Sequence, residues 1–154
     1  MTDVIAFFPG QGAQQVGRLS DISEQYSEIS ETFTEASDAL GIDLWTMVTE
    51  GPDSTLNQTF NTQPALLAAS TAVWRVVSKH SPALNVTAGA GHSLGEYSAL
   101  VCADVISLPQ AVKLVEKRGE YMQASVPEGI GAMAAVIGLD DDSIIDACAK
   151  AAGD

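Results

Sequence analysis

The chain has 154 residues, 46% of them hydrophobic and 18% charged, a composition typical of one globular domain with a sizeable core and unlike that of a disordered segment. Asp and Glu total 20 against 7 Lys and Arg, and the resulting formal net charge of −13 repels nucleic-acid phosphates and anionic membrane surfaces. We therefore expect neither a nucleic acid nor a membrane as a partner.

The first predicted element is a buried parallel strand over residues 4–8, a continuous apolar run that stops at Pro9-Gly10. No cationic stretch precedes this run, and it is too short for a signal peptide or a membrane span. A glycine-rich turn follows over residues 10–15. These features, together with two cysteines that lack redox spacing, predict a protein of the reducing cytoplasm.

Helices are predicted over much of the next segment. Apolar residues recur at helical spacing over residues 20–40, so one face of this helix should pack inward, and Gly41 should end it. A short helix is expected over residues 44–49. Residues 55–61 should be irregular or briefly helical.

The next predicted helix has Pro64 in its first turn and continues to Val77. It is apolar nearly all round, so we expect it at the centre of the fold. His80 falls at its C-terminal end, where an imidazole can meet the helix dipole. We therefore assign His80 a structural role rather than a catalytic one.

A second short buried strand is predicted over residues 86–91, and it leads through the pentapeptide G-H-S-L-G at 91–95 into a helix over 96–103. A G-x-S-x-G string between a strand and a helix is typical of a nucleophile elbow, in which a sharp turn exposes a serine hydroxyl. Ser93 is therefore the candidate nucleophile, and the helix behind it would direct its N-terminal dipole towards an oxyanion. The alternative is that Ser93 only caps the helix.

Pro109 begins another predicted helix, which runs to about Ala124 and carries three closely spaced cations. The alternation of strands and helices up to this point predicts a parallel α/β sheet. Lys113 and Lys117, four residues apart, are interpreted first as solvated charges. A local anion site that includes Arg118 is the alternative.

The character of the chain changes after Pro127. Residues 131–139 have the pattern of a small-residue strand, and residues 140–143 cap an amphipathic helix. One strand and one helix cannot bury both of their faces, so this region is expected to open a second unit whose remainder is absent. We therefore divide the chain into residues 1–126 and 127–154.

Cys102 and Cys148 show neither metal-ligand nor redox spacing, and their apolar, helix-like surroundings predict buried free thiols. The chain has only two histidines, His80 and His92, and no cluster of histidines with carboxylates. No metal site is therefore expected.

Five short strings along the chain point to a known family. They are Phe8-Pro9-Gly10-Gln11-Gly12, Thr62-Gln63-Pro64-Ala65, Gly91-His92-Ser93-Leu94-Gly95-Glu96, Arg118-Gly119 with Met122, and Gly131-Ala132-Met133. Their order and spacing resemble the malonyl-CoA:acyl carrier protein transacylases of bacterial fatty-acid synthesis along the whole chain. The resemblance implies an α/β fold, with an α/β-hydrolase-like core built on a parallel sheet and the start of a small ferredoxin-like subdomain.

The resemblance also implies a ping-pong reaction without a metal or cofactor. The serine takes malonyl from malonyl-CoA and passes it to the phosphopantetheine thiol of acyl carrier protein, so these two molecules are the expected partners. Ser93 would be the nucleophile, and the N–H groups of Gln11 and Leu94 would form the oxyanion hole. In the alternative, the segment around Gln11 is only a tight turn.

Arg118 corresponds to the arginine with which this family binds malonate, and its guanidinium would hold the free carboxylate through two parallel hydrogen bonds. From the sequence alone, an exposed Arg118 paired with Glu116 or Glu120 is the alternative. His92 and Gln63 correspond to pocket residues of the family, although Gln63 would equally suit a helix-entry cap.

No general base is expected among these residues. His92 adjoins Ser93, but neighbouring side chains at such a turn diverge, whereas a base must approach the hydroxyl to about 2.6–3.2 Å. In the family, the catalytic histidine comes from the later half of the protein, so this chain is expected to be inactive alone. Two alternative functions stay open, namely a serine esterase or acyltransferase for neutral acyl groups, and a non-catalytic folded fragment that binds acyl carrier protein or its missing half.

Overall fold

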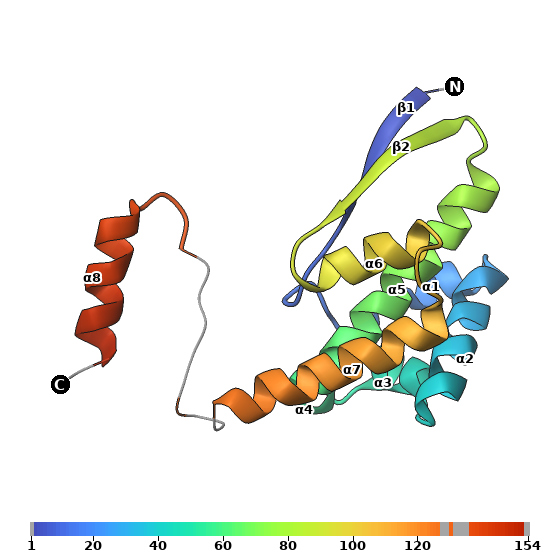
Figure 1. Ribbon diagram of the computed structural model, residues 1–154. Helices are drawn as coiled ribbons and strands as arrows, with labels where there is room; N and C mark the ends of the chain where they lie inside the picture. Colours follow the sequence, from blue (N-terminus) through green and yellow to red (C-terminus); the bar gives the residue numbers. More distant parts are fainter. Residues whose placement is uncertain (1, 127–129, 131–135, 153–154) are drawn as a thin grey trace.

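The computed structural model describes residues 2–126, 130 and 136–152 (Figure 1). Its elements follow in chain order as β1 (Thr2–Phe8), α1 (Ser20–Ser23), α2 (Ser27–Leu40), α3 (Leu44–Glu50), α4 (Asp53–Leu56), α5 (Thr59–His80), β2 (Leu84–Gly91), α6 (Leu94–Cys102), α7 (Leu108–Ser125) and α8 (Asp141–Ala152). The chain therefore has a mixed α/β architecture, as the sequence predicts.

Strands β1 and β2 pair in parallel and form a two-stranded sheet within the described residues. Thr2 pairs with Leu84 at one end, and Phe8 pairs with Gly91 at the other. Because the strands are parallel, both finish at the same edge of the sheet. That edge brings together the glycine-rich turn after β1 and the turn that leads into α6, and such an edge is where α/β folds place their sites.

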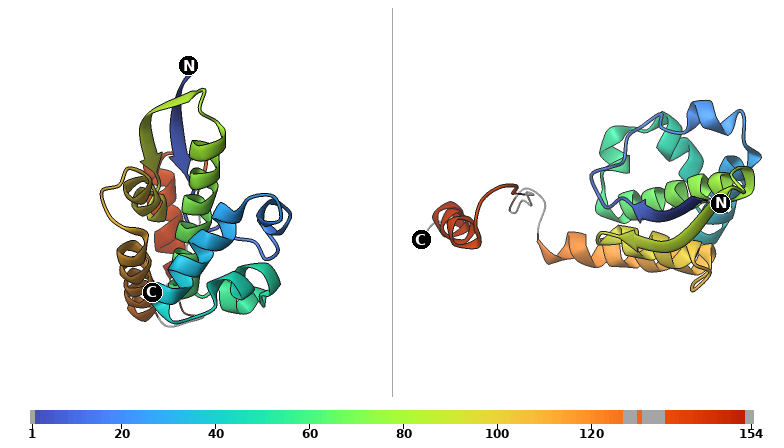
Figure 2. Two further views of the ribbon diagram at one scale, coloured as in Figure 1. Left: turned by 90° about the vertical axis from the view of Figure 1, so that its right-hand side faces the viewer. Right: turned by 90° about the horizontal axis from the view of Figure 1, so that it is seen from above.

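The core lies in the helices rather than in the sheet. Helix α5 is central, and its residues 61–68 are all buried. Helices α2 and α7 pack against α5, and α6 packs against both strands. Seen from above, β1 runs over α5 and β2 runs over α6 (Figure 2). The largest fully buried apolar side chains are Phe33, Ile29, Leu44, Leu56, Leu67 and Leu94.

The prediction that both strands are buried is wrong for the structure described here. Val4, Ala6 and Phe8 are half-buried, whereas the alternate side chains Ile5 and Phe7 are 56% and 79% exposed. Residues 87–90 of β2 are exposed as well. Successive residues of a strand point to opposite faces, and among the described residues the helices cover only one face of this sheet.

The predicted helix boundaries need two corrections. The stretch expected to be one helix over residues 20–40 divides into α1 and α2, and Gly41 ends α2 with a φ of 72°. Helix α5 begins at Thr59, so Pro64 lies inside the helix rather than in its first turn. Proline has no N–H to donate to the carbonyl four residues earlier, but burial of the residues around it holds the helix together.

The predicted helix near the C-terminus is confirmed as α8. Asp140 caps it, because its carboxylate accepts hydrogen bonds from the N–H and the hydroxyl of Ser143, both at 2.9 Å. The predicted strand over 131–139 falls partly on residues 131–135, which lie outside the described residues. Residues 136–139 contain no strand. The proposed division of the chain at residue 127 stays a prediction.

The prediction that both cysteines are buried is wrong for Cys148, which is exposed on α8, a helix without a buried residue. Cys102 is half-buried at the end of α6. Burial raises the pKa of the Cys102 thiol to about 12. Cys102 therefore remains a neutral thiol at physiological pH.

Candidate active site

Ser93 lies on a strained turn between β2 and α6. Its φ of 55° and ψ of −105° place a non-glycine residue in a region of backbone space that L-residues seldom adopt. The turn is tight enough to require glycine on both sides. A Cβ at Gly91 would lie 2.0 Å from the carbonyl carbon of Gly95, and a Cβ at Gly95 would lie 2.2 Å from the carbonyl oxygen of Phe8. This close packing holds the half-buried Ser93 at the end of the sheet.

The first turn of α6 presents a backbone donor beside Ser93. Gly95 donates its N–H to the carbonyl of His92 at 2.9 Å, and Glu96 donates to the carbonyl of Ser93 at 3.3 Å. For the N–H of Leu94 there is no acceptor among the residues that the structure describes. A helix N-terminus leaves such N–H groups free to bind an anion.

The predicted second donor, Gln11, belongs to the exposed turn after β1. Its neighbour Gly10 lies against the residue before Ser93, because a Cβ at Gly10 would be 2.9 Å from the carbonyl oxygen of His92. The two loops are therefore in contact at the sheet edge. His92 itself is exposed.

Arg118 extends from α7 to the serine. Its Nη2 donates to Ser93 Oγ at 2.8 Å, and its Nη1 donates to Gln63 Oε1, also at 2.8 Å. The guanidinium carbon lies 5.7 Å from the centroid of the Tyr97 ring, a distance at which a cation and an aromatic face attract. The side chain is half-buried and forms no ion pair with the described carboxylates. The alternative that Arg118 pairs with Glu116 or Glu120 is therefore wrong for this structure.

Close packing of α7 on α5 allows Arg118 to approach Ser93 and Gln63. Gly119 is buried, and a Cβ there would lie 2.5 Å from Phe60 Cα of α5. Gln63 is fully buried, and its Nε2 donates to Met122 Sδ at 3.2 Å. Met122 had no assigned role, although its four-residue spacing from Arg118 is a signal that both lie on one helix face.

The two lysines of α7 do not join Arg118 in one cluster. Both are exposed. Lys117 pairs with Glu120 and lies 5.1 Å from the centroid of the Tyr121 ring. Among the described residues these contacts are those of a solvated helix face, which is the first interpretation of the sequence.

His80 lies at the other end of α5 in a cluster with Glu28. Its Nε2 is 3.1 Å from Glu28 Oε1, and Lys79 also pairs with Glu28. The hydrogen bond from Lys79, helped by other donors that include His80, lowers the pKa of the largely buried Glu28 to about 2. His80 therefore has the structural role that the sequence predicts, through its contact with the Glu28 carboxylate of α2.

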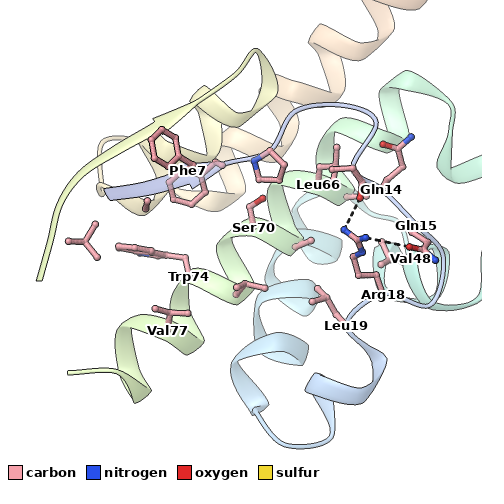
Figure 3. A pocket seen from close by; sticks show the side chains of 18 of the residues that line it. Phe7, Gln14, Gln15, Arg18, Leu19, Val48, Leu66, Ser70, Trp74 and Val77 are labelled. Carbon is pink, nitrogen blue, oxygen red and sulfur yellow. Dashed lines mark hydrogen bonds between the residues drawn. The ribbon is translucent and has the colours of Figure 1, made fainter. Parts of the chain in front are cut away.

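A separate apolar cavity of about 460 Å³ lies between β1, α5 and the loop that follows β1 (Figure 3). Phe7, Leu66, Trp74 and Val77 are among its lining side chains, and Arg18 closes one side through hydrogen bonds to Ala13 and Gln15. Ser93, Gln63 and Arg118 do not line it. The candidate site is therefore the partly buried junction of β2, α5 and α7 rather than this cavity.

Ser93 Oγ has Arg118 as its hydrogen-bond partner, and no described histidine bonds to it. Within the described ranges, no group of three or more His, Cys, Asp or Glu side chains is placed to hold a metal ion. None of the described helices combines the length and the apolar character needed to cross a bilayer.

The sequence is similar to those of known acyl transferases. A family profile described as "Acyl transferase domain" matches residues 7–150. The chain is 58% identical over 144 residues to the malonyl CoA-acyl carrier protein transacylase of Haemophilus influenzae, covering 94% of this chain and 46% of the relative. It is 57% identical over 155 residues to the protein of the same name from Escherichia coli strain K12, and this match covers 99% of this chain and 49% of that relative.

Among solved structures, the chain is similar to a malonyl-transacylase. That structure contains the transacylase in complex with a type II PKS acyl carrier protein. The TM-score is 0.89 at 53% identity, and the match covers 99% of this chain and 49% of that one. The chain thus spans about half the length of the curated relatives it matches.

Proposed function

The chain belongs to the acyl transferase domain family, and from that premise we propose that it carries the acyl-transfer site of a malonyl-CoA:acyl carrier protein transacylase. The observation that carries the proposal is the hydrogen bond of 2.8 Å from Arg118 Nη2 to Ser93 Oγ. A nucleophile on a strained elbow is common to many hydrolases and transferases. A guanidinium beside that nucleophile suits an acyl group with a free carboxylate.

In the proposed reaction, Ser93 Oγ attacks the thioester carbon of malonyl-CoA and passes its proton to a base. The oxyanion that forms is held by the N–H groups of Leu94 and Gln11. The C–S bond then breaks, the thiol of coenzyme A leaves with a proton, and malonyl stays as an ester on Ser93. The phosphopantetheine thiol of acyl carrier protein attacks this ester, which releases Ser93 for another turnover.

Arg118 selects the substrate in this scheme. In the structure its Nη2 donates to Ser93 Oγ. Once malonyl is attached to that oxygen, the guanidinium turns to the free carboxylate a few bonds away and binds it through two parallel hydrogen bonds. Gln63 and Tyr97 hold the guanidinium through contacts that do not use the carboxylate. An acetyl group has no carboxylate and gains nothing from this arrangement.

The base is proposed to be a histidine from the part of the relatives that this chain does not span. We also propose that residues 1–126 belong to an α/β-hydrolase-like core and that residues 127–154 open a ferredoxin-like subdomain. The reaction would take place in the cytoplasm with no cofactor, with malonyl-CoA and acyl carrier protein as partners.

Mass spectrometry after incubation with labelled malonyl-CoA tests the proposal. The chain is compared with a hybrid that extends it by the segment of the Escherichia coli K12 relative beyond the match. We expect the hybrid to carry malonyl on Ser93 and to transfer it to acyl carrier protein, whereas the chain alone should react at least about 10²-fold more slowly without its base. A Ser93→Ala hybrid is the control. Labelling of this control, or an unlabelled parent hybrid that is fully folded, would contradict the proposal.

Substitution of Arg118 by alanine separates a malonyl transferase from an enzyme for neutral acyl groups. In the hybrid, Arg118→Ala should lower kcat/KM for malonyl-CoA by about 10- to 10²-fold, as expected for loss of a charge-assisted hydrogen bond. Transfer from acetyl-CoA should persist or rise. Equal losses for both substrates would favour the neutral-acyl enzyme.

A further inference from the structure

The buried amide of Gln63 joins two residues of α7 that lie one turn apart. Its Oε1 accepts from Arg118 Nη1 at 2.8 Å, and its Nε2 donates to Met122 Sδ at 3.2 Å. Gln63 is fully buried, whereas Met122 is 36% exposed. Met122 is therefore the more exposed end of a chain of contacts whose other end is Ser93.

The chemistry of the guanidinium dictates how this amide must lie. A guanidinium has only donors, so the carbonyl oxygen of Gln63 must face Arg118, and the NH₂ group must face the other way. On that other side, Met122 Sδ is the acceptor found among the described residues. A thioether is a weak acceptor, but a buried amide NH₂ without any acceptor is costly. The sulfur thus favours the one orientation of the amide that serves Arg118.

The packing of the two helices keeps this geometry in place. Arg118 and Met122 are four residues apart, so they lie on one face of α7. Between them, Gly119 brings α7 against Phe60 of α5, and Thr59 Oγ1 donates to Gln123 Oε1 at 3.3 Å one turn further on. The separation of the two helices is therefore fixed about one turn of α5 before the Gln63 amide.

We propose that Met122 is a positioning residue, whose thioether orients the Gln63 amide and thereby holds the Arg118 guanidinium beside Ser93. The inference rests on the proposed function, because the effect on substrate choice requires Arg118 to bind a carboxylate. If the amide turned over, its NH₂ would face the guanidinium, and Arg118 would lose its acceptor on α5. The loss would affect substrates with a free carboxylate and spare those without one.

Two substitutions separate this role from simple packing. Met122→Leu keeps an apolar side chain of similar volume and removes the acceptor, whereas Met122→Gln keeps an acceptor at a similar distance from the backbone. Met47→Leu is the matched control, because Met47 packs against the core from α3, away from Arg118. Neither Met122 nor Met47 is fully buried, so all three variants should fold, which circular dichroism and thermal melting check.

The first measurement uses the chain itself and needs no turnover. Side-chain NMR signals of the Gln63 NH₂ and the Arg118 guanidinium are followed in each variant. We expect Met122→Leu to shift both signals and to speed hydrogen exchange of the Gln63 NH₂. Met122→Gln should restore slow exchange, and Met47→Leu should change neither signal. Unchanged Gln63 and Arg118 signals in Met122→Leu, or the same change in both Met122 variants, would overturn the proposal.

The second measurement uses the malonyl-transferring hybrid. Met122→Leu should raise KM for malonyl-CoA by about three- to tenfold, the range expected for one net hydrogen bond, while kcat stays within about twofold. The rate with acetyl-CoA should not change, and Met122→Gln should recover most of the loss. A parallel loss with malonyl-CoA and acetyl-CoA would assign Met122 a structural role and overturn the proposal. Failure of the proposed function would instead appear as an unlabelled Ser93 with the NMR coupling intact.

Discussion

The side chains of the helical layer are more deeply buried than those of the sheet. The candidate site combines residues from both regions. Phe33 of α2 is fully buried, whereas Phe7 of β1 is 79% exposed. Arg118 and Gln63 come from helices of the densely packed layer, but Ser93 lies at the end of a thinly covered strand. The proposed carboxylate-binding residue Arg118 is thus supported by this chain's own core. The proposed nucleophile Ser93 depends on a sheet that the described residues cover on one face.

The sharpest test of this difference compares one phenylalanine from each region. Phe33→Ala should lower the free energy of unfolding by about 3–5 kcal/mol, because it leaves a cavity in the core and removes the edge-to-face contact with Trp45. Phe7→Ala should change it by less than about 0.5 kcal/mol, as for most exposed positions. Urea denaturation of both variants provides the comparison. A loss above about 2 kcal/mol for Phe7→Ala would mean that the outer face of the sheet is covered in solution.

A smaller effect is expected where α5 and α7, the helices that carry Gln63 and Arg118, meet. Gly119→Ala places a Cβ 2.5 Å from Phe60 Cα, so α7 must move away from α5 at a cost of about 1–3 kcal/mol. The movement should also weaken the contact of Arg118 with Ser93, which the guanidinium NMR signal reports. Lys113→Ala, an exposed change on the same helix, is the control and should leave both stability and signal unaltered. If Gly119→Ala were as stable as the wild type, α7 and α5 would be less tightly packed in solution than in the structure.

The smallest expected effect concerns the charged cluster that joins α2 to the end of α5. The pKa of Glu28 is about 2 in the folded chain against an ordinary value of 4.5. Its ionised form therefore contributes stability that is fully present above pH 4.5 and is lost as the pH falls towards 2. Glu28→Gln should flatten this part of the pH profile in urea denaturation. Glu24→Gln, an exposed change nearby, should leave the profile as it is, and an unchanged slope in Glu28→Gln would contradict the role of the cluster.

Much of the fold was predictable because its signals are local. The two strands, the glycine that ends α2 and the helix that begins near Pro109 all follow from patterns within a few residues. The predicted strained turn at Ser93 also follows, because the glycines on each side are needed for any such bend. The position of Pro64 inside α5 was not predictable. Its cost is offset by burial against other helices, which no local pattern records.

The candidate site likewise combines features that follow from neighbouring residues with contacts between residues far apart in the sequence. The order of residues along the chain was enough to propose Ser93 as a candidate nucleophile, and the resemblance to a family was enough to propose Arg118 as a candidate substrate-binding residue. The contact of Arg118 with Ser93, the burial of Gln63 and the sulfur of Met122 behind it depend on residues that are 25 to 59 positions apart. Such contacts arise only when α7 packs on α5 and the parallel strands align their ends. A strand's exposure likewise depends on what covers its two faces, and its own sequence does not specify that.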